Sequence, residues 1–292
     1  MRGRRALVIR HVPHEGLAGY REPIEAAGYT IDRIDVSDPA FPSLDLCAPD
    51  LLVMMGGPMG VYEQERHPWI ACQLRRLRRR LEAERPTLGV CFGAQMIAEA
   101  LGGRVFAGPR SEVGFHPVTV HGEAAENPLR HLVGQPVLHW HGDTFALPER
   151  VELLASSHVY AHQAFRRGRY ILALQFHAEM GLDPRFDAWI EQWPDAVVEA
   201  GGDEASLRAA HARHGPAAVA AGQRAIADWI GGLRAGADAL PGLGPGAYSS
   251  SSTYSSGGSI RSASVIESRI AAVSSRTLSI SARNRQSASG RQ

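Results

Sequence analysis

Lysine is missing from this chain of 292 residues, in which all 31 of the Lys+Arg residues are arginine. The absence excludes mechanisms that depend on a lysine amine, namely a Schiff base, a Ser–Lys dyad and a phosphate-binding P-loop. The glycine-rich segment MGGPMG at 55–60 is therefore not a Walker A loop.

Cysteine is scarce as well. The chain has Cys47, Cys72 and Cys91, and no two of them have CxxC spacing. An odd number of widely spaced cysteines argues against a disulfide framework and against a structural zinc site. The formal net charge of +1 gives no reason to expect nucleic-acid binding, and the arginine run in 69–84 is read as the solvated face of a helix.

Long apolar runs are also absent. None approaches the ~18–20 residues that a membrane-spanning helix needs. The basic N-terminus is followed by an apolar run of only Ala6 to Ile9, which is too short for the core of a signal peptide. We therefore expect a cytoplasmic protein that makes no membrane contact.

The composition changes sharply near Pro241. Residues 241–292 contain 16 serines and six arginines but a single acidic residue. Low hydrophobicity together with abundant serine and glycine predicts a disordered tail. Residues 1–240 are expected to form one catalytic domain.

Within residues 1–240, signals for strands and helices alternate. Strands are predicted at 6–12, 29–36, 50–55, 87–90, 116–120, 136–140, 151–156 and 170–177. Helices are predicted at 16–28, 69–84, 94–103, 184–193, 203–213 and 216–234. Strands separated by crossover helices predict an α/β fold with a mostly parallel, open sheet flanked by helices on both faces.

In such sheets, ligands bind beyond the carboxyl ends of the strands. One strand is followed by Cys91 in the segment GVCFG, with a glycine two residues away on either side. Small residues there permit a tight strand-to-helix turn that projects a nucleophile above the sheet. The N-terminus of the next helix favours a thiolate. We interpret Cys91 as a nucleophile, whereas Cys47 and Cys72 are read as packing residues.

A cysteine nucleophile needs a base. Of the 13 histidines, His177 lies in the segment QFHAE, two residues before Glu179. Alternate residues of an extended segment share a face, so the carboxylate of Glu179 is expected to orient the imidazole of His177.

A third strand end carries Gly56, Gly57 and Pro58. A glycine amide at this position is free to bind a ligand. Together with the N–H of Phe92, which follows the nucleophile, it would form an oxyanion hole for acyl transfer.

The ordered set GGPMG, GVCFGAQ and QFHAEM resembles the class I glutamine amidotransferases, and most of all their free-standing, GMP-synthase-like members, over about residues 1–235. The resemblance implies a flavodoxin-like fold and a cysteine that attacks the side-chain amide of glutamine. It implies that Cys91 is the nucleophile, His177 the base and Glu179 the carboxylate that orients the base. It also implies oxyanion amides at Gly57 and Phe92 and a substrate-binding side chain at Gln95. We expect Gly56 to contact the substrate as well. Ala178 departs from the family, which usually has proline there.

Two further segments are expected to border the site. HWHGDTFALP at 139–148 looks like a segment shared by the free-standing members, and it supplies His141 and Asp143. SEVGFHPV at 111–118 is expected to form a substrate-lining loop with Glu112 or His116 in contact. His139 and His141 have metal-ligand spacing, but no third ligand is evident and Cys–His chemistry needs no metal. No metal or cofactor is therefore predicted.

Glutamine is thus the predicted substrate. No synthetase domain is evident after residue 240, so a separate synthetase subunit would have to accept the ammonia. The same machinery would also serve a γ-glutamyl peptide hydrolase, which needs no acceptor. A binding or regulatory protein on this scaffold, or another enzyme with a cysteine at a strand end, such as a redox or glyoxalase-like protein, remain alternatives. The pair of His177 and Glu179 argues against the last of these.

Overall fold

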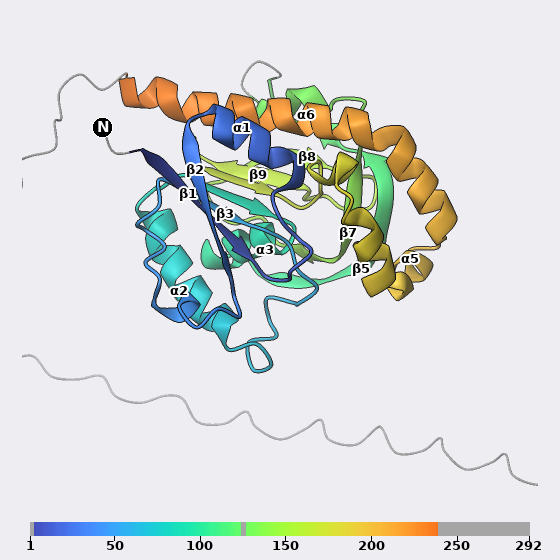
Figure 1. The fold of residues 1–292 in the computed structure, drawn as a ribbon, viewed down its shortest axis with the longest axis horizontal. Coiled ribbons are helices and arrows are strands. Elements are labelled where there is room, and N and C mark those ends of the chain that lie inside the picture. Colours follow the sequence, from blue (N-terminus) through green and yellow to red (C-terminus); the bar gives the residue numbers. More distant parts are fainter. Residues whose placement is uncertain (1–2, 124–126, 239–292) are drawn as a thin grey trace, which may run out of the picture. The chain divides into compact units, whose positions relative to one another are not determined.

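The computed structural model describes residues 3–123 and 127–238. Its central feature is an eight-stranded sheet (Figure 1). The strands lie in the order β2 (Tyr29–Asp35), β1 (Arg4–Arg10), β3 (Leu51–Met54), β4 (Thr87–Val90), β10 (Ile171–Leu174), β9 (Ala164–Arg167), β8 (Glu152–Ser156) and β6 (Thr119–Val120). The first five strands pair in parallel, and the pairings β10–β9, β9–β8 and β8–β6 are antiparallel. This confirms the predicted mostly parallel sheet.

Alternation along the central strands divides the core between the two faces of the sheet. Ala6 and Val8 of β1 pack on one side with residues of the long helix α6 (Glu204–Asp238). Ile9 packs on the other side with α2 (Trp69–Glu82) and α3 (Phe92–Ala100). Figure 1 shows α6 and the short α1 (Arg21–Ala26) over one face, with α2 and α3 over the opposite one. Strands buried on both faces explain the continuous apolar runs of the sequence.

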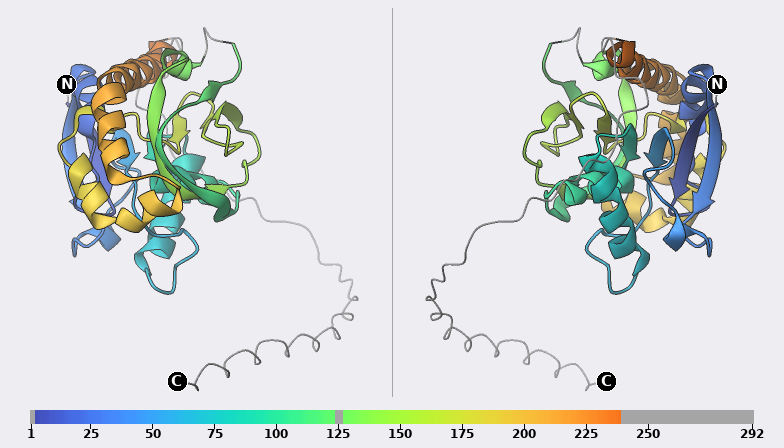
Figure 2. Two further views of the ribbon diagram at one scale, coloured as in Figure 1. Left: turned by 90° about the vertical axis from the view of Figure 1, so that its right-hand side faces the viewer. Right: turned by 90° about the vertical axis from the view of Figure 1, so that its left-hand side faces the viewer.

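A second sheet consists of two long antiparallel strands, β5 (Val105–Pro117) and β7 (Pro136–Phe145). In the side views of Figure 2 this ribbon lies beside the main sheet. The sequence pattern predicted only 116–120 and 136–140 as strands here, and it assigned 111–118 to a loop. Pairing on both sides of an irregularity between Ala107 and Glu112 extends the strands well beyond their apolar stretches.

The C-terminal helices also differ from the prediction. Instead of two helices at 203–213 and 216–234, α6 runs unbroken through Pro216. Beside the proline, Gly215 lies so close to Gly181 that a Cβ on Gly215 would come within 2.1 Å of the Gly181 carbonyl oxygen. This contact holds α6 against the 3-10 turn Met180–Leu182, and tertiary packing thereby offsets the ~3 kcal/mol that an internal proline costs a helix.

Other boundaries are close to those predicted, with some additions. The segment 16–28 forms a 3-10 turn, Ala18–Tyr20, followed by α1. The helix predicted at 184–193 is α4 (Phe186–Gln192), and α5 (Pro194–Glu199) and β9 were not predicted. Further 3-10 turns lie at Phe41–Ser43 and Pro128–Leu132. Within the described ranges, no helix is long and apolar enough to cross a bilayer. The predicted tail, 241–292, lies outside the described residues, as does the boundary at 240.

Candidate active site

Cys91 occupies the turn between β4 and α3, at the carboxyl edge of the sheet. Its backbone has φ 52° and ψ −111°, a left-handed conformation that non-glycine residues rarely adopt. A strained conformation of this kind is held only when the surrounding structure enforces it, and it is common at functional sites. The predicted sharp turn at Cys91 is present.

The two flanking glycines make this turn possible. A Cβ on Gly93 would lie 2.1 Å from the carbonyl oxygen of Met54, and a Cβ on Gly89 would lie 2.5 Å from that of Gly93. These contacts are with backbone atoms, which have little room to move. Glycine therefore lets the first turn of α3 pack directly against β3 and β4, and the same packing fixes the position of Cys91.

His177 and Glu179 follow the end of β10 and lie beside Cys91. The Nδ1 atom of His177 is 2.7 Å from Oε1 of Glu179, and both side chains are buried. Burial lowers the pKa of His177. The negative charges of Glu179 and Cys91, with hydrogen bonds to both, more than offset this effect and hold that pKa well above its ordinary value. The imidazole thus lies between a carboxylate and a sulfur, which both favour its charged form.

His177 and Cys91 each contact a backbone carbonyl of strand β7. The N–H of His177 donates to the carbonyl of Leu138 on β7, at 2.7 Å. The carbonyl oxygen of the neighbouring Trp140 lies 3.8 Å from the sulfur of Cys91. Strand β7 therefore spans both residues and forms one wall of the site.

A cavity of about 480 Å³ opens above Cys91, within the size range of small-molecule sites. The predicted residues that line it are Cys91, His177, Gly57, Gln95, His141 and Asp143. Gln95 also donates a hydrogen bond to the side chain of Gln175 at 3.2 Å. On its far side the cavity reaches Trp193 and α5, where Asp195 and Glu199 contribute to the lining.

Gly56, Gly57 and Phe92 surround the nucleophile. A Cβ on Gly56 would lie 2.0 Å from Oε2 of Glu15 and 3.3 Å from the Cβ of Cys91, so this glycine leaves room for the Glu15 carboxylate close to Cys91. Phe92 is the first residue of α3 and is fully buried. The two segments expected to supply oxyanion amides thus meet at Cys91.

Glu112 and His116 do not lie where the sequence analysis expected them. Neither is among the described residues that line the cavity. Both belong to strand β5, and Glu112 is buried behind the wall against His139 and His141. The substrate contacts predicted for these two residues are not supported.

Glu15, which no sequence motif indicated, is buried in the lining of the cavity. Burial raises its pKa to about 7, with the charge of His177 acting against this shift and that of Glu179 adding to it. Its Oε2 atom has no hydrogen-bond partner among the described residues. Glu15 lies in the loop after β1, which also ends at this edge of the sheet. Its position after a predicted strand was the sequence feature that could have placed it in the site.

His11, which no sequence motif indicated either, packs against the Gly56–Gly57 segment. Its Nδ1 lies 2.8 Å from the carbonyl oxygen of Met55, and its ring stacks on Trp69 and meets the edge of Phe92. Burial lowers the pKa of His11 to about 4, so the ring is neutral at pH 7 and donates its Nδ1 proton to that carbonyl. His11 therefore links the two segments that flank Cys91.

Comparison with known proteins gives a consistent result. Residues 21–194 match the family model described as glutamine amidotransferase class-I. The chain is 29% identical over 182 residues to the glutamine amidotransferase-like protein YfeJ of Salmonella typhimurium, a match that covers 60% of this chain and 75% of YfeJ. It is 34% identical over 155 residues to the glutamine-hydrolyzing GMP synthase of Thermomicrobium roseum, covering 50% of this chain but only 26% of that synthase.

Solved structures agree with the sequence relatives. A glutamine amidotransferase from Thermotoga maritima superposes with a TM-score of 0.67 at 28% identity, covering 79% of this chain and 99% of that one. A glutamine amidotransferase from Methylobacillus flagellatus gives a TM-score of 0.64 at 25% identity, covering 79% and 96% of the two chains.

Proposed function

Because this chain belongs to the class-I glutamine amidotransferase family, we propose that it hydrolyses the side-chain amide of glutamine to glutamate and ammonia through Cys91. The observation that carries the proposal is the buried hydrogen bond between His177 and Glu179, with the raised pKa of His177 beside the sulfur of Cys91. A thiolate paired with an imidazolium is the reactive form of a cysteine nucleophile.

In the first half of the reaction, the thiolate attacks the carbonyl carbon of the side-chain amide and forms a C–S bond. The negative charge that develops on the amide oxygen is bound by the backbone N–H groups of Gly57 and Phe92. When the tetrahedral intermediate collapses, the C–N bond breaks and the imidazolium of His177 gives its proton to the nitrogen. Ammonia leaves, and a glutamyl thioester remains on Cys91.

In the second half, the neutral imidazole of His177 takes a proton from water, and the oxygen attacks the thioester. Glutamate is released when the C–S bond breaks, and the thiolate and imidazolium are restored. Glu179 keeps the Nδ1 proton of His177 in place, so that Nε2 faces the reacting atoms in both halves. The substrate's amide nitrogen and the attacking water use the same side of the imidazole.

The fate of the ammonia is the second part of the proposal. The similarity to part of a glutamine-hydrolyzing GMP synthase supports a separate synthetase subunit as the acceptor of ammonia. The acceptor would bind at the mouth of the cavity, where the product leaves.

A γ-glutamyl peptide hydrolase is the second candidate. Its favouring observation is the extension of the cavity past Cys91 to Trp193 and α5, which gives room for a leaving group larger than ammonia. The acyl group and the residues that attack it are the same in both reactions, so only the leaving group differs.

The deciding experiment measures ammonia and glutamate release from glutamine by the purified full chain, with Cys91→Ser in parallel and a γ-glutamyl dipeptide as the second substrate. We expect turnover of glutamine and a loss of more than about 10³-fold in Cys91→Ser. Turnover of the dipeptide alone would replace the proposal with the second candidate. Inertness toward both substrates would favour a binding protein on this scaffold, and activity that survives in Cys91→Ser would overturn the mechanism.

A further inference from the structure

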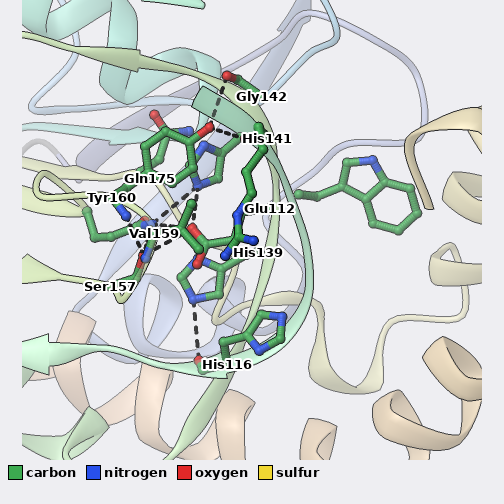
Figure 3. Close-up of polar contacts among 12 residues, drawn as sticks. Glu112, His116, His139, His141, Gly142, Ser157, Val159, Tyr160 and Gln175 are labelled. Carbon is green, nitrogen blue, oxygen red and sulfur yellow. Dashed lines mark hydrogen bonds and ion pairs between the residues drawn. The ribbon is translucent and has the colours of Figure 1, made fainter. Parts of the chain in front are cut away.

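The β5–β7 ribbon carries a buried cluster of two histidines and one carboxylate behind the wall of the cavity. Glu112 on β5 pairs directly with His141 on β7, and His139 lies two residues before His141. Alternate residues of a strand share a face, so all three side chains are turned toward one another (Figure 3). His139 is 0% exposed, Glu112 4% and His141 7%, so the cluster is closed to bulk solvent.

The outer nitrogen of each imidazole already has a partner that fixes its proton. His139 Nε2 lies 3.3 Å from the carbonyl oxygen of His116, and His141 Nδ1 lies 3.0 Å from that of Asp143. A carbonyl oxygen only accepts hydrogen bonds, so each outer nitrogen carries the ring proton. In the neutral form of each ring, the lone pairs of His139 Nδ1 and His141 Nε2 therefore face inward.

Three acceptor atoms consequently meet inside the protein. Oε2 of Glu112 is 3.4 Å from His139 Nδ1 and 3.3 Å from His141 Nε2. His139 Nδ1 has no hydrogen-bond partner among the described residues. Two imidazole lone pairs and a carboxylate oxygen repel one another at these separations in a buried site, and a cation placed between them would turn that repulsion into attraction.

The separations between these atoms fit a metal ion. Zinc lies about 2.0–2.1 Å from nitrogen and oxygen ligands, and neighbouring ligands of a tetrahedron are then about 3.3–3.4 Å apart. Both separations from Glu112 have these values. Two imidazoles and a carboxylate are a known zinc donor set, and metal-bound histidines usually donate their other N–H to a carbonyl or carboxylate, as both do here.

Ser157 and Gln163 complete the surroundings of the carboxylate. Both donate to Oε2 of Glu112, at 3.1 Å and 2.7 Å, and so hold it in place. The Oε1 atom of Gln163 is buried and has no partner among the described residues, while its amide nitrogen lies 3.3 Å from His141 Nε2.

We propose that Glu112, His139 and His141 bind one divalent transition-metal ion, with Zn²⁺ the best match to two imidazoles and a carboxylate. The site is distinct from Cys91 and does not depend on the substrate of the enzyme. His141 also lines the cavity, which gives the ion a route to the cluster. A bound ion ties β5 to β7, and β7 contributes the Trp140 carbonyl beside the sulfur of Cys91. The ion therefore stiffens one wall of the candidate active site.

The test uses the full chain with Cys91→Ala, because the catalytic thiolate would itself bind metal. The protein is stripped with a chelator, dialysed and titrated with Co²⁺, whose visible absorption reports coordination. We expect one Co²⁺ per chain, bands of a four- or five-coordinate site without sulfur charge transfer, displacement by Zn²⁺, and a higher midpoint of thermal unfolding with metal. No binding at one equivalent would show that a proton holds the cluster together and would overturn the proposal.

Variants locate the ion. Glu112→Gln and His139→Gln should each weaken Co²⁺ binding by more than about 100-fold. His131→Gln is the matched control, since His131 is a partly buried histidine that pairs with Asp228 of α6 instead, and it should bind one Co²⁺ like the parent. Circular dichroism checks that each variant is folded. Equal binding by the parent and a folded Glu112→Gln protein would place the metal elsewhere and reject the site.

Discussion

The Nδ1 atom of His177 lies 2.7 Å from Oε1 of Glu179, with each side chain only 1% exposed. A charge-assisted hydrogen bond that is buried from solvent fixes both the tautomer and the orientation of the His177 imidazole. The raised pKa of His177 follows largely from this neighbour, so the carboxylate controls the form in which the histidine meets Cys91.

Replacing Glu179 with Gln should therefore lower kcat/KM for glutamine by about 10²- to 10⁴-fold. A glutamine amide that donates to Nδ1 moves the ring proton to Nε2, which is the wrong tautomer for a base. The pKa of His177 should fall as well, so the alkaline limb of the kcat/KM–pH profile should move to lower pH.

The measurement is a full pH profile of both proteins, with Glu191→Gln as the control because Glu191 is an exposed carboxylate on α4. A Glu179→Gln enzyme with an unchanged profile and a loss below about 3-fold would show that the carboxylate has no part in positioning the base.

Gly93→Ala should destabilise the protein by more than about 2 kcal/mol. The new Cβ would lie 2.1 Å from the Met54 carbonyl oxygen, and only a shift of the α3 backbone relieves that contact. Such a shift would also displace Cys91, so activity should fall even in the fraction that remains folded.

Urea unfolding compares this variant with Gly231→Ala. Gly231 is an exposed glycine within α6, where a Cβ would meet nothing within 4 Å. That control should gain about 0.5–1 kcal/mol from the better helix propensity of alanine. Similar effects of the two substitutions would contradict the steric role of Gly93.

Glu15→Gln should stabilise the protein at alkaline pH and have little effect in acid. The folded-state pKa of Glu15 is about 7, above its ordinary value of 4.5, so the folded state binds this proton more tightly. Stability from this group is fully present below pH 4.5 and is lost as pH rises to 7. The loss amounts to about 3 kcal/mol, and the variant avoids it.

Free energies of unfolding at pH 4.5 and pH 8 test this expectation. Glu82→Gln, which changes an exposed carboxylate at the end of α2, should alter stability by less than about 0.5 kcal/mol at both values. If Glu15→Gln shifts stability equally at pH 4.5 and pH 8, its carboxyl group does not titrate with a raised pKa.

His11→Phe should show the opposite pH dependence. The pKa of His11 is lowered to about 4 in the folded state, so the unfolded chain binds the proton more tightly. Stability from this group is present above pH 6.5 and is lost as pH falls to 4, by about 3 kcal/mol. Phenylalanine keeps the stacking on Trp69 but cannot titrate. Between pH 6.5 and pH 4, the free energy of unfolding should therefore fall less in the variant than in the parent protein.

At pH 8 the same variant should lose about 1–2 kcal/mol, because the Met55 carbonyl and Gln73 lose their partner. Its kcat should fall roughly 10-fold with little change in KM, as expected when an oxyanion segment is loosened. His67→Phe is the control, a more exposed histidine that also touches Trp69. An unaltered acid stability in His11→Phe would refute the lowered pKa.

Much of this molecule was accessible from the sequence alone, because the signals are local. Buried strands appear as short apolar runs, and their carboxyl ends share one edge of a parallel sheet. The segment around Cys91 and the segment with His177 and Glu179 therefore had to meet there. The glycines beside Cys91 identified the sharp turn, because no larger residue fits so close to the backbone of β3.

Only the tertiary structure decided the features that depend on pairing and burial between distant parts of the chain. The register of β5 against β7 places Glu112 opposite His141, and no local pattern specifies that register. Burial is the largest cause of the shifted pKa values of Glu15 and His11. The Gly181–Gly215 contact supports α6 through a proline that local propensity reads as a break. The periodicity of apolar residues along the chain determines which helices and strands form. Long-range packing determines which of their side chains are buried and which groups those side chains contact.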